Sequence, residues 1–134
     1  MLAALVAAFA LTSPAFHAGG TIPARYTCMG ADVSPPLRWT APPRGTRSFS
    51  ITVVDLDAHG FVHWRAGGIV ASARSLRAGA HPPVEGLNTF GRRGYAGPCP
   101  PTASGSHRYV FTLGALGSGG RVLAQARLLG RFRR

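Results

Sequence analysis

Proline and glycine interrupt this chain so often that no long helix can be fitted into it. The 134 residues include 18 glycines and 11 prolines. Proline removes a backbone donor, and glycine weakens a helix that contains it. Pairs of adjacent prolines at 35–36, 42–43 and 82–83 mark loops or extended edges. This punctuation favours many turns and short strands over long helices.

Apolar residues alternate with small polar ones in several segments, which is the pattern of strands with one buried face. The clearest predicted strand is 48–55, SFSITVVD, and 61–70 and 107–116 are two more. The segment 71–80 has room for one short helical turn. The segment 122–132 suits either a helix or a closing strand. Short strands separated by turns predict an antiparallel β-sandwich or barrel.

Length and charge limit the classes of partner. A chain of this length is expected to form one domain, 1–134, and its 46% hydrophobic content suits a packed core. All 15 basic residues are arginines, against 4 acidic residues, so the net charge is +11 and anionic partners are plausible. The arginines are scattered, and only the C-terminal tail clusters them. No recognition motif is present, so specific nucleic-acid binding is not expected.

Two features bear on the compartment in which the protein works. The apolar run 1–11 is too short to span a membrane, and it has the length of a signal-peptide core but no basic residue before it. We therefore expect a cytoplasmic protein, with export as the alternative if this run is a truncated signal peptide. Cys28 and Cys99 show no zinc spacing. They are either two free buried thiols or one disulfide between two loops, which would suit an exported protein.

The segment 55–64, DLDAHGFVHW, contains two of the four acidic residues and two of the five histidines. Such neighbours predict carboxylate–imidazole pairs, in which an aspartate fixes the tautomer and orientation of a histidine. His63 is equally well interpreted as a core histidine, and Asp55 or Asp57 as a turn residue. A metal site is conceivable from the ligand types, but the spacing matches no strong metal signature. We expect neither a metal nor a cofactor.

A stiff loop, GPCPP at 97–101, precedes a strand that opens with His107. Such a loop is either plain architecture or one wall of a pocket. Nucleophilic catalysis finds little support, because there is no Gly-x-Ser-x-Gly motif and no serine can be assigned to a histidine. Cys99 and His107 could form a thiolate–imidazole pair, but the flanking prolines favour a loop role for the cysteine. No catalytic residue is predicted.

Motifs in collinear order along nearly the whole chain carry a resemblance to one family. They are TSPAF at 12–16, GGTIP at 19–23, RYTC at 25–28, SPPLRW at 34–39, DLDA at 55–58, HW at 63–64, GLNTFG at 86–91, GYAGPCPP at 94–101 and HRY at 107–109. The chain resembles the bacterial branch of the phosphatidylethanolamine-binding protein family, the Raf-kinase-inhibitor-like proteins. The resemblance implies a mainly β fold, an antiparallel Greek-key β-sandwich with few short helices, and a small anion pocket at one end.

The resemblance also implies the residues of that pocket. They would be Asp55, His63 and His107 as a polar floor, Tyr109 beside them, and Gly97, Pro98, Cys99, Pro100 and Pro101 as the rim. The two imidazoles would donate to an oxyanion, with Asp55 polarising one of them. We infer from their motif positions that Asp57 and Arg108 form a supporting salt bridge.

Two departures from the family pattern are expected to matter. Leu56 and His59 replace prolines, so the turn that presents Asp55 should be looser. Only GSGG at 117–120 replaces a helical segment that the family usually has before its last strand, which should expose apolar surface.

The expected function is non-enzymatic binding of a small anion or phosphorylated head group. Regulation of an unidentified protein target of the kinase or protease type, and homodimer formation, are further expectations. A hydrolase that uses the same Asp and His groups is the alternative.

Overall fold

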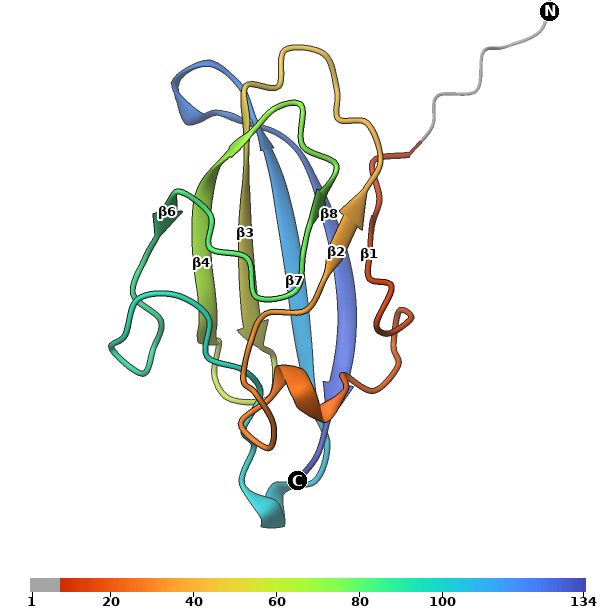
Figure 1. Ribbon diagram of the computed structural model, residues 1–134, viewed down its shortest axis with the longest axis vertical. Coiled ribbons are helices and arrows are strands. Elements are labelled where there is room, and N and C mark those ends of the chain that lie inside the picture. The colour runs from red at the N-terminus through yellow and green to blue at the C-terminus, as the bar shows by residue number, and fades with distance from the viewer. Residues whose placement is uncertain (1–7) are drawn as a thin grey trace, which may run out of the picture.

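The computed structural model describes residues 8–134, which form two antiparallel sheets (Figure 1). The smaller sheet has the order β1-β2-β5, with β1 (Leu11–Thr12), β2 (Leu37–Trp39) and β5 (Ser75–Leu76). The larger sheet has the order β6-β4-β3-β7-β8, with β3 (Ser48–Asp55), β4 (Phe61–Val70), β6 (Val84–Glu85), β7 (His107–Leu116) and β8 (Val122–Phe132). Helical structure in this range is limited to the 3-10 turns η1 (Ala24–Tyr26), η2 (Thr102–Ser104) and η3 (Ser118–Gly120). The mainly β, antiparallel fold is confirmed, and the Greek-key connectivity stays a prediction.

The core lies between the two sheets, where the alternating apolar side chains of the larger sheet meet the smaller one. Phe49, Ile51 and Val53 of β3 are fully buried. On β7, Phe111 pairs with Val53, and from the smaller sheet Trp39 packs edge-on against Phe49 with ring centroids 5.3 Å apart. Each such side chain contributes about 1.5–3 kcal/mol when fully buried. The alternation read from the sequence is therefore the alternation between core and outer face.

Two segments for which the sequence suggests helical structure contain strands instead. The predicted helical turn at 71–80 is wrong, because Ser75–Leu76 forms β5 and pairs with Leu37–Arg38 of β2. The segment 122–132 is the closing strand, paired with β7 along its length. Hydrogen bonding to the distant strand β2 in the first segment, and to the preceding strand β7 in the second, outweighs the local preference for a helix.

Residues 1–7, which form most of the apolar N-terminal run, lie outside the described residues. The end of that run belongs to β1, where Leu11 pairs with Trp39. From residue 8 onward, no helix is long and apolar enough to cross a membrane.

The connection between β7 and β8 is short, as the sequence predicts. It consists of the single turn η3, in which Gly119 and Gly120 have φ angles of 68° and 77°, a region that favours glycine. On the outer face of the larger sheet, Val54, Val110 and Leu129 are neighbours on adjacent strands and stay partly exposed.

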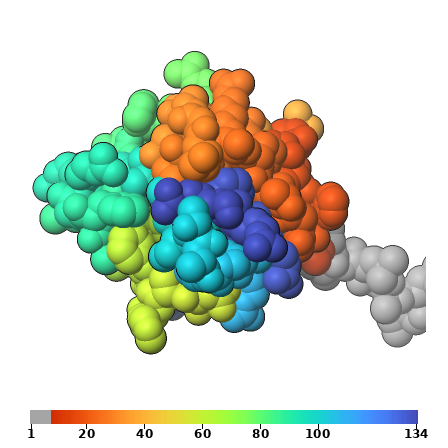
Figure 2. All heavy atoms as spheres, turned by 90° about the horizontal axis from the view of Figure 1, so that it is seen from below, coloured from red at the N-terminus to blue at the C-terminus, as the bar shows by residue number. Residues whose placement is uncertain are grey.

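Loops that are far apart in the sequence meet at one end of the molecule. Viewed from that end, the turn between β3 and β4, the segment before β7, the η1 region and the C-terminus lie together (Figure 2). Since antiparallel neighbours alternate in direction, the end of β3 lies beside the starts of β4 and β7. Polar residues at those three strand ends are thereby gathered at one place.

Candidate functional site

A small cavity opens at this gathering of strand ends. Its volume is about 160 Å³. Pockets for drug-sized ligands measure roughly 300–1,000 Å³, so this one suits a smaller molecule. The residues that line it are Asp55, Ala58, Phe61, His63, Phe90, Cys99, Pro100, Pro101, His107 and Tyr109.

A buried carboxylate–imidazole pair forms one wall. Asp55 and His107 are only 3% and 7% exposed, and Nδ1 of His107 lies 2.7 Å from Oδ2 of Asp55. A carboxylate can only accept, so Nδ1 carries the hydrogen and donates it. The other oxygen of Asp55 accepts from the backbone N–H of Asp57 at 2.8 Å. Nε2 of His107 is directed to Ser104, whose Oγ lies 2.9 Å away.

His63 is likewise held through its Nδ1 nitrogen. Its Nδ1 donates to the carbonyl oxygen of Ala96 at 2.6 Å, which leaves Nε2 as the ring nitrogen available to the cavity. Burial lowers the pKa of the His63 ring below its ordinary value, more strongly than the Ala96 carbonyl and the charge of Asp55 raise it. A neutral ring with its hydrogen on Nδ1 has a bare Nε2, which is an acceptor.

Tyr109 brings an unpartnered hydroxyl to the same cavity. The residue is fully buried, and its Oη is the single buried side-chain polar atom among residues 8–134 that has no hydrogen-bond partner. Burial raises the pKa of this phenol, and the negative charge and the close approach of the Asp55 carboxylate add to the effect, although the geometry between the two groups is not that of a formed hydrogen bond. The hydroxyl is therefore a proton donor at ordinary pH. Leaving such a group unpaired costs about 1–3 kcal/mol, so a partner from outside the chain would be favourable.

The rim loop is held in place by the region around η1. Cys28 and Cys99 form a disulfide with a Cα–Cα distance of 5.4 Å, so the free-thiol alternative is wrong. Oδ1 of Asp32 accepts from the backbone N–H of Gly97 at 2.7 Å, which fixes the rim loop to the η1 region. A side chain at Gly97 would collide with the Tyr26 carbonyl oxygen. The rim is thus fastened behind the cavity by a covalent bond and by close packing.

Asp57 and Arg108 lie beside the cavity and form the inferred salt bridge. Nη2 of Arg108 lies 2.8 Å from Oδ1 of Asp57, and its backbone N–H donates to Oδ2 at 2.8 Å. These bonds lower the pKa of Asp57 to about 2. The turn that carries Asp57 is also tied to β7, because Leu56 N–H donates to the Arg108 carbonyl at 2.8 Å. These bonds to the neighbouring strand β7 hold the turn in place without the two prolines of the family pattern.

The structure brings most of the predicted pocket residues together. Those that line the cavity are Asp55, His63, Cys99, Pro100, Pro101, His107 and Tyr109, whereas Gly97 and Pro98 do not line it. Sequence reasoning missed Phe61, Phe90 and Ser104. Phe90 belongs to the GLNTFG motif, and Ser104 lies three residues before His107. Their closeness in sequence to predicted site residues or motifs could have identified both. Within 8–134, no group of three or more His, Cys, Asp or Glu side chains is placed to hold a metal ion.

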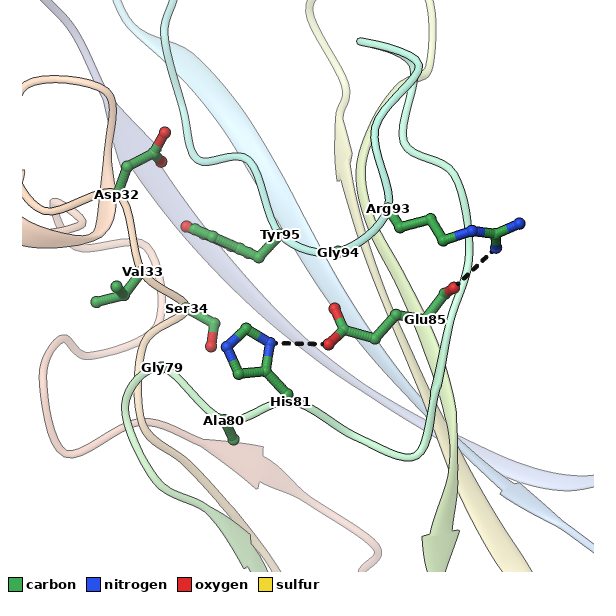
Figure 3. A pocket seen from close by; sticks show the side chains of 10 residues that line it. All are labelled: Asp32, Val33, Ser34, Gly79, Ala80, His81, Glu85, Arg93, Gly94 and Tyr95. Atoms are coloured by element: carbon green, nitrogen blue, oxygen red, sulfur yellow. Dashed lines mark hydrogen bonds and ion pairs between the residues drawn. The ribbon is translucent and has the colours of Figure 1, made fainter.

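A second cavity, of about 200 Å³, is lined in part by Arg93, Gly94 and Tyr95, which belong to the segment that leads to the rim (Figure 3). Its charged groups are largely bonded to one another. His81 Nδ1 lies 2.9 Å from Oε1 of Glu85, and Arg93 donates to the Glu85 carbonyl at 3.2 Å. Tyr95 extends toward the segment that carries Asp32 (Figure 3). The hydroxyl of Tyr95 donates to the Tyr26 carbonyl at 2.6 Å, which fastens the segment before the rim.

The chain is thus a mainly β protein with a small pocket at one end of the larger sheet, in which a few polar groups lie among apolar walls. The family model for phosphatidylethanolamine-binding protein matches residues 12–132. The chain therefore belongs to the phosphatidylethanolamine-binding protein family.

Relatives and solved structures agree with this assignment. The UPF0098 protein of Aquifex aeolicus is 37% identical in an alignment 149 residues long, gaps included, that covers 91% of this chain and 86% of that protein. A candidate lipoprotein of Mycobacterium tuberculosis, LppC, is 42% identical over 107 residues, which cover 77% of this chain and 53% of that protein. The crystal structure of Escherichia coli YbcL, described as a member of the mammalian PEBP family, has a TM-score of 0.87 and 29% identity over 96% of this chain and 99% of YbcL. The chain thus spans about half of the mycobacterial relative.

Proposed function

We propose that the protein binds a small oxyanion, such as phosphate or a phosphorylated head group, in the cavity between Asp55, His63, His107 and Tyr109. The observation that carries this proposal is the buried hydroxyl of Tyr109, which has no partner within residues 8–134 and lines the cavity. Regulation of a kinase or protease partner and homodimer formation stay predictions.

Two donors would meet the anion from β7. Tyr109 donates from its hydroxyl, and His107 donates from Nε2 when that nitrogen carries a proton. Asp55 orients the ring for this contact, because its Oδ2 accepts from Nδ1 of His107 at 2.7 Å. The hydroxyl of Ser104 lies 2.9 Å from Nε2 of His107. Its position in the exposed turn η2 allows it to give way to a ligand oxygen.

Overall charge does not explain recognition at this site. The chain has 15 basic residues, yet no arginine is among the described residues that line the cavity. The remaining walls are the rings of Phe61 and Phe90 and the prolines of the rim. The surrounding positive charge would attract anions to the protein, and short-range hydrogen bonds would select among them.

The proposal is tested by thermal melts with and without millimolar phosphate. A ligand that binds only the folded state adds about 2.7 kcal/mol of stability at a hundredfold excess over Kd. We expect a shift in the parent protein and its loss in Tyr109→Phe. Tyr26→Phe, which changes a tyrosine outside the cavity, should keep the shift. A parent protein that phosphate, acetate and phosphoethanolamine all fail to stabilise would refute the proposal.

A second candidate, ester hydrolysis, is favoured by one chain of contacts. Asp55, His107 and Ser104 are linked at 2.7 Å and 2.9 Å in the order of a Ser-His-Asp triad. Against it, Ser104 Oγ also lies 2.8 Å from the Pro101 carbonyl, which competes for its single hydrogen. Turnover of p-nitrophenyl acetate that disappears in Ser104→Ala and survives in Ser106→Ala would support hydrolysis. Equal background rates in all three proteins would exclude it.

We further propose that the protein works in an oxidising compartment, the exported alternative of the sequence analysis. The bond between Cys28 and Cys99 supports this, because structural disulfides persist mainly outside the reducing cytoplasm. The candidate lipoprotein among the relatives is consistent with it. The test is alkylation of free thiols in intact cells that produce the protein. Unmodified protein supports export, and two alkylated cysteines contradict it.

A further inference from the structure

The second cavity, of about 200 Å³, contains the two acidic residues that the candidate site does not use. No described residue lines both cavities. Of the four acidic residues in the chain, Asp55 and Asp57 have basic partners at the candidate site. The other two, Asp32 and Glu85, both line the second cavity (Figure 3). Within 8–134 neither carboxylate forms an ion pair with an arginine, although the chain has 15 arginines.

Glu85 is a largely buried carboxylate without a permanent cation beside it. Its side chain is 16% exposed. Oε1 accepts from Nδ1 of His81 at 2.9 Å, and Oε2 accepts from Nε1 of Trp64 at 3.3 Å. Arg93 donates to the backbone carbonyl of Glu85 instead of to its carboxylate. Buried charges are normally paired, and His81 is a weak partner because its side chain is 86% exposed.

Two further acceptors and an aromatic ring belong to the same cavity. Ser34 is 2% exposed, and its hydroxyl is directed into the cavity and has no hydrogen-bond partner among the described residues (Figure 3). Oδ1 of Asp32 accepts from Gly97, and no bond within 8–134 uses its Oδ2. The hydroxyl of Tyr95 is already bonded to the Tyr26 carbonyl, so only its ring is available to a ligand. Carboxylate oxygens, a hydroxyl and an aromatic face are groups that attract a cation.

We infer that the second cavity is a separate binding site for a small organic cation with a primary ammonium group. An ammonium has three hydrogens and no lone pair, so it donates to Oδ2 of Asp32, the hydroxyl of Ser34 and Oε1 of Glu85. The alkyl part of the ligand contacts Val33 and the ring of Tyr95, which also line the cavity. A volume of about 200 Å³ suits a molecule of a few heavy atoms. This inference does not depend on the proposed anion site.

His81 is the group that the ligand replaces. It donates to Oε1 of Glu85, the oxygen that the ammonium needs, and an exposed pair of this kind contributes little to stability. Arg93 stays in place, because it is bonded to a backbone carbonyl and its guanidinium lies away from Ser34 (Figure 3). A metal ion suits the cavity less well than an ammonium, since no three side chains of the metal-binding types within 8–134 converge there.

Titration followed by ¹H–¹⁵N NMR compares propylammonium with 1-propanol at neutral pH and constant ionic strength. The two ligands have the same size, and only the first is charged. We expect propylammonium to bind at least about tenfold more tightly, the size of one hydrogen bond between charged groups, with the largest shift changes at the amides of Ser34, Gly79 and Gly94. A net charge of +11 repels cations, so overall charge does not produce this result. Equal affinities, no saturable binding, or shift changes centred on His107 and Tyr109 would overturn the inference.

Four variants identify the groups responsible. Ser34→Ala and Asp32→Asn should each weaken propylammonium binding by about threefold to tenfold, the range for one hydrogen bond. Asp32→Asn keeps an oxygen that can accept from Gly97, so the rim should stay in place. Ser118→Arg, at an exposed position in η3, changes the net charge by the same amount as Asp32→Asn and should leave the affinity nearly unchanged. His81→Ala should bind more tightly, because it removes the group that competes for Glu85.

Two outcomes of this series would contradict the inference. An equal loss of affinity in Ser118→Arg and Asp32→Asn would show that only long-range electrostatics acts on the ligand. Displacement of propylammonium by millimolar phosphate would show that it occupies the other cavity, because no described residue lines both. Retention of propylammonium at saturating phosphate supports two independent sites.

Discussion

Removal of the disulfide should destabilise the protein strongly while leaving its anion affinity nearly unchanged. The double variant Cys28→Ala/Cys99→Ala opens a loop closed over a sequence separation of 71. In the chain-entropy account, a cross-link of this span raises the free energy of unfolding by about 4 kcal/mol, because it restricts the unfolded chain. For a protein of this size, the loss corresponds to a fall in the melting temperature of roughly 15 °C.

The folded rim should survive the change. Asp32 still accepts from Gly97 at 2.7 Å, and the backbone N–H of residue 28 still donates to the Pro98 carbonyl at 3.1 Å. These bonds do not involve the sulfurs. Phosphate affinity at low temperature, where the variant is folded, should therefore stay close to that of the parent.

The assay is guanidinium unfolding of three samples: the oxidised parent, the parent reduced with excess thiol, and the double variant. The last two should unfold at similar, much lower denaturant concentrations than the first. A difference below about 1 kcal/mol would refute the entropic reasoning. A large loss of phosphate affinity in the folded variant would show that the disulfide positions the rim, contrary to the argument from the backbone bonds.

The remaining predictions concern single side chains. Tyr109→Phe should raise the free energy of unfolding of the ligand-free protein by about 1 kcal/mol, measured by urea denaturation, because it removes an unpaired buried hydroxyl; a clear loss of stability would contradict this. Since the folded state lowers the pKa of His63, the unfolded chain binds the extra proton first, so stability should fall as the pH drops below 6.5, and less so in His63→Phe. The bonds from Arg108 lower the pKa of Asp57 from 3.8 to about 2, so their contribution should be present above pH 3.8 and be lost as the pH falls toward 2. Acid-unfolding curves of Asp57→Asn should lack that component, and an unchanged curve would show that the pair is not coupled to folding.

Local patterns were sufficient to predict the strands that form the core. In 48–55 every second residue is apolar, and a strand that rests one face on a core requires this period of two. The same reasoning failed at 71–80, where only two residues form a strand and their partner is β2, more than thirty residues earlier. Short strands of this kind form because of the strand to which they are hydrogen-bonded, and a short stretch of sequence gives no information about that distant partner.

By itself, the sequence determined the β class, three of the four long strands among the described residues and, through the collinear motifs, the family and most of the residues that line the pocket. The tertiary structure decided what those residues can do. The proton on His63 is assigned by the carbonyl of Ala96, 33 residues away, and the pairing of the cysteines depends on a Cα–Cα distance of 5.4 Å between two loops. Donor and acceptor roles depend on the atoms that lie within about 3 Å, and folding, rather than the order of residues along the chain, sets those distances.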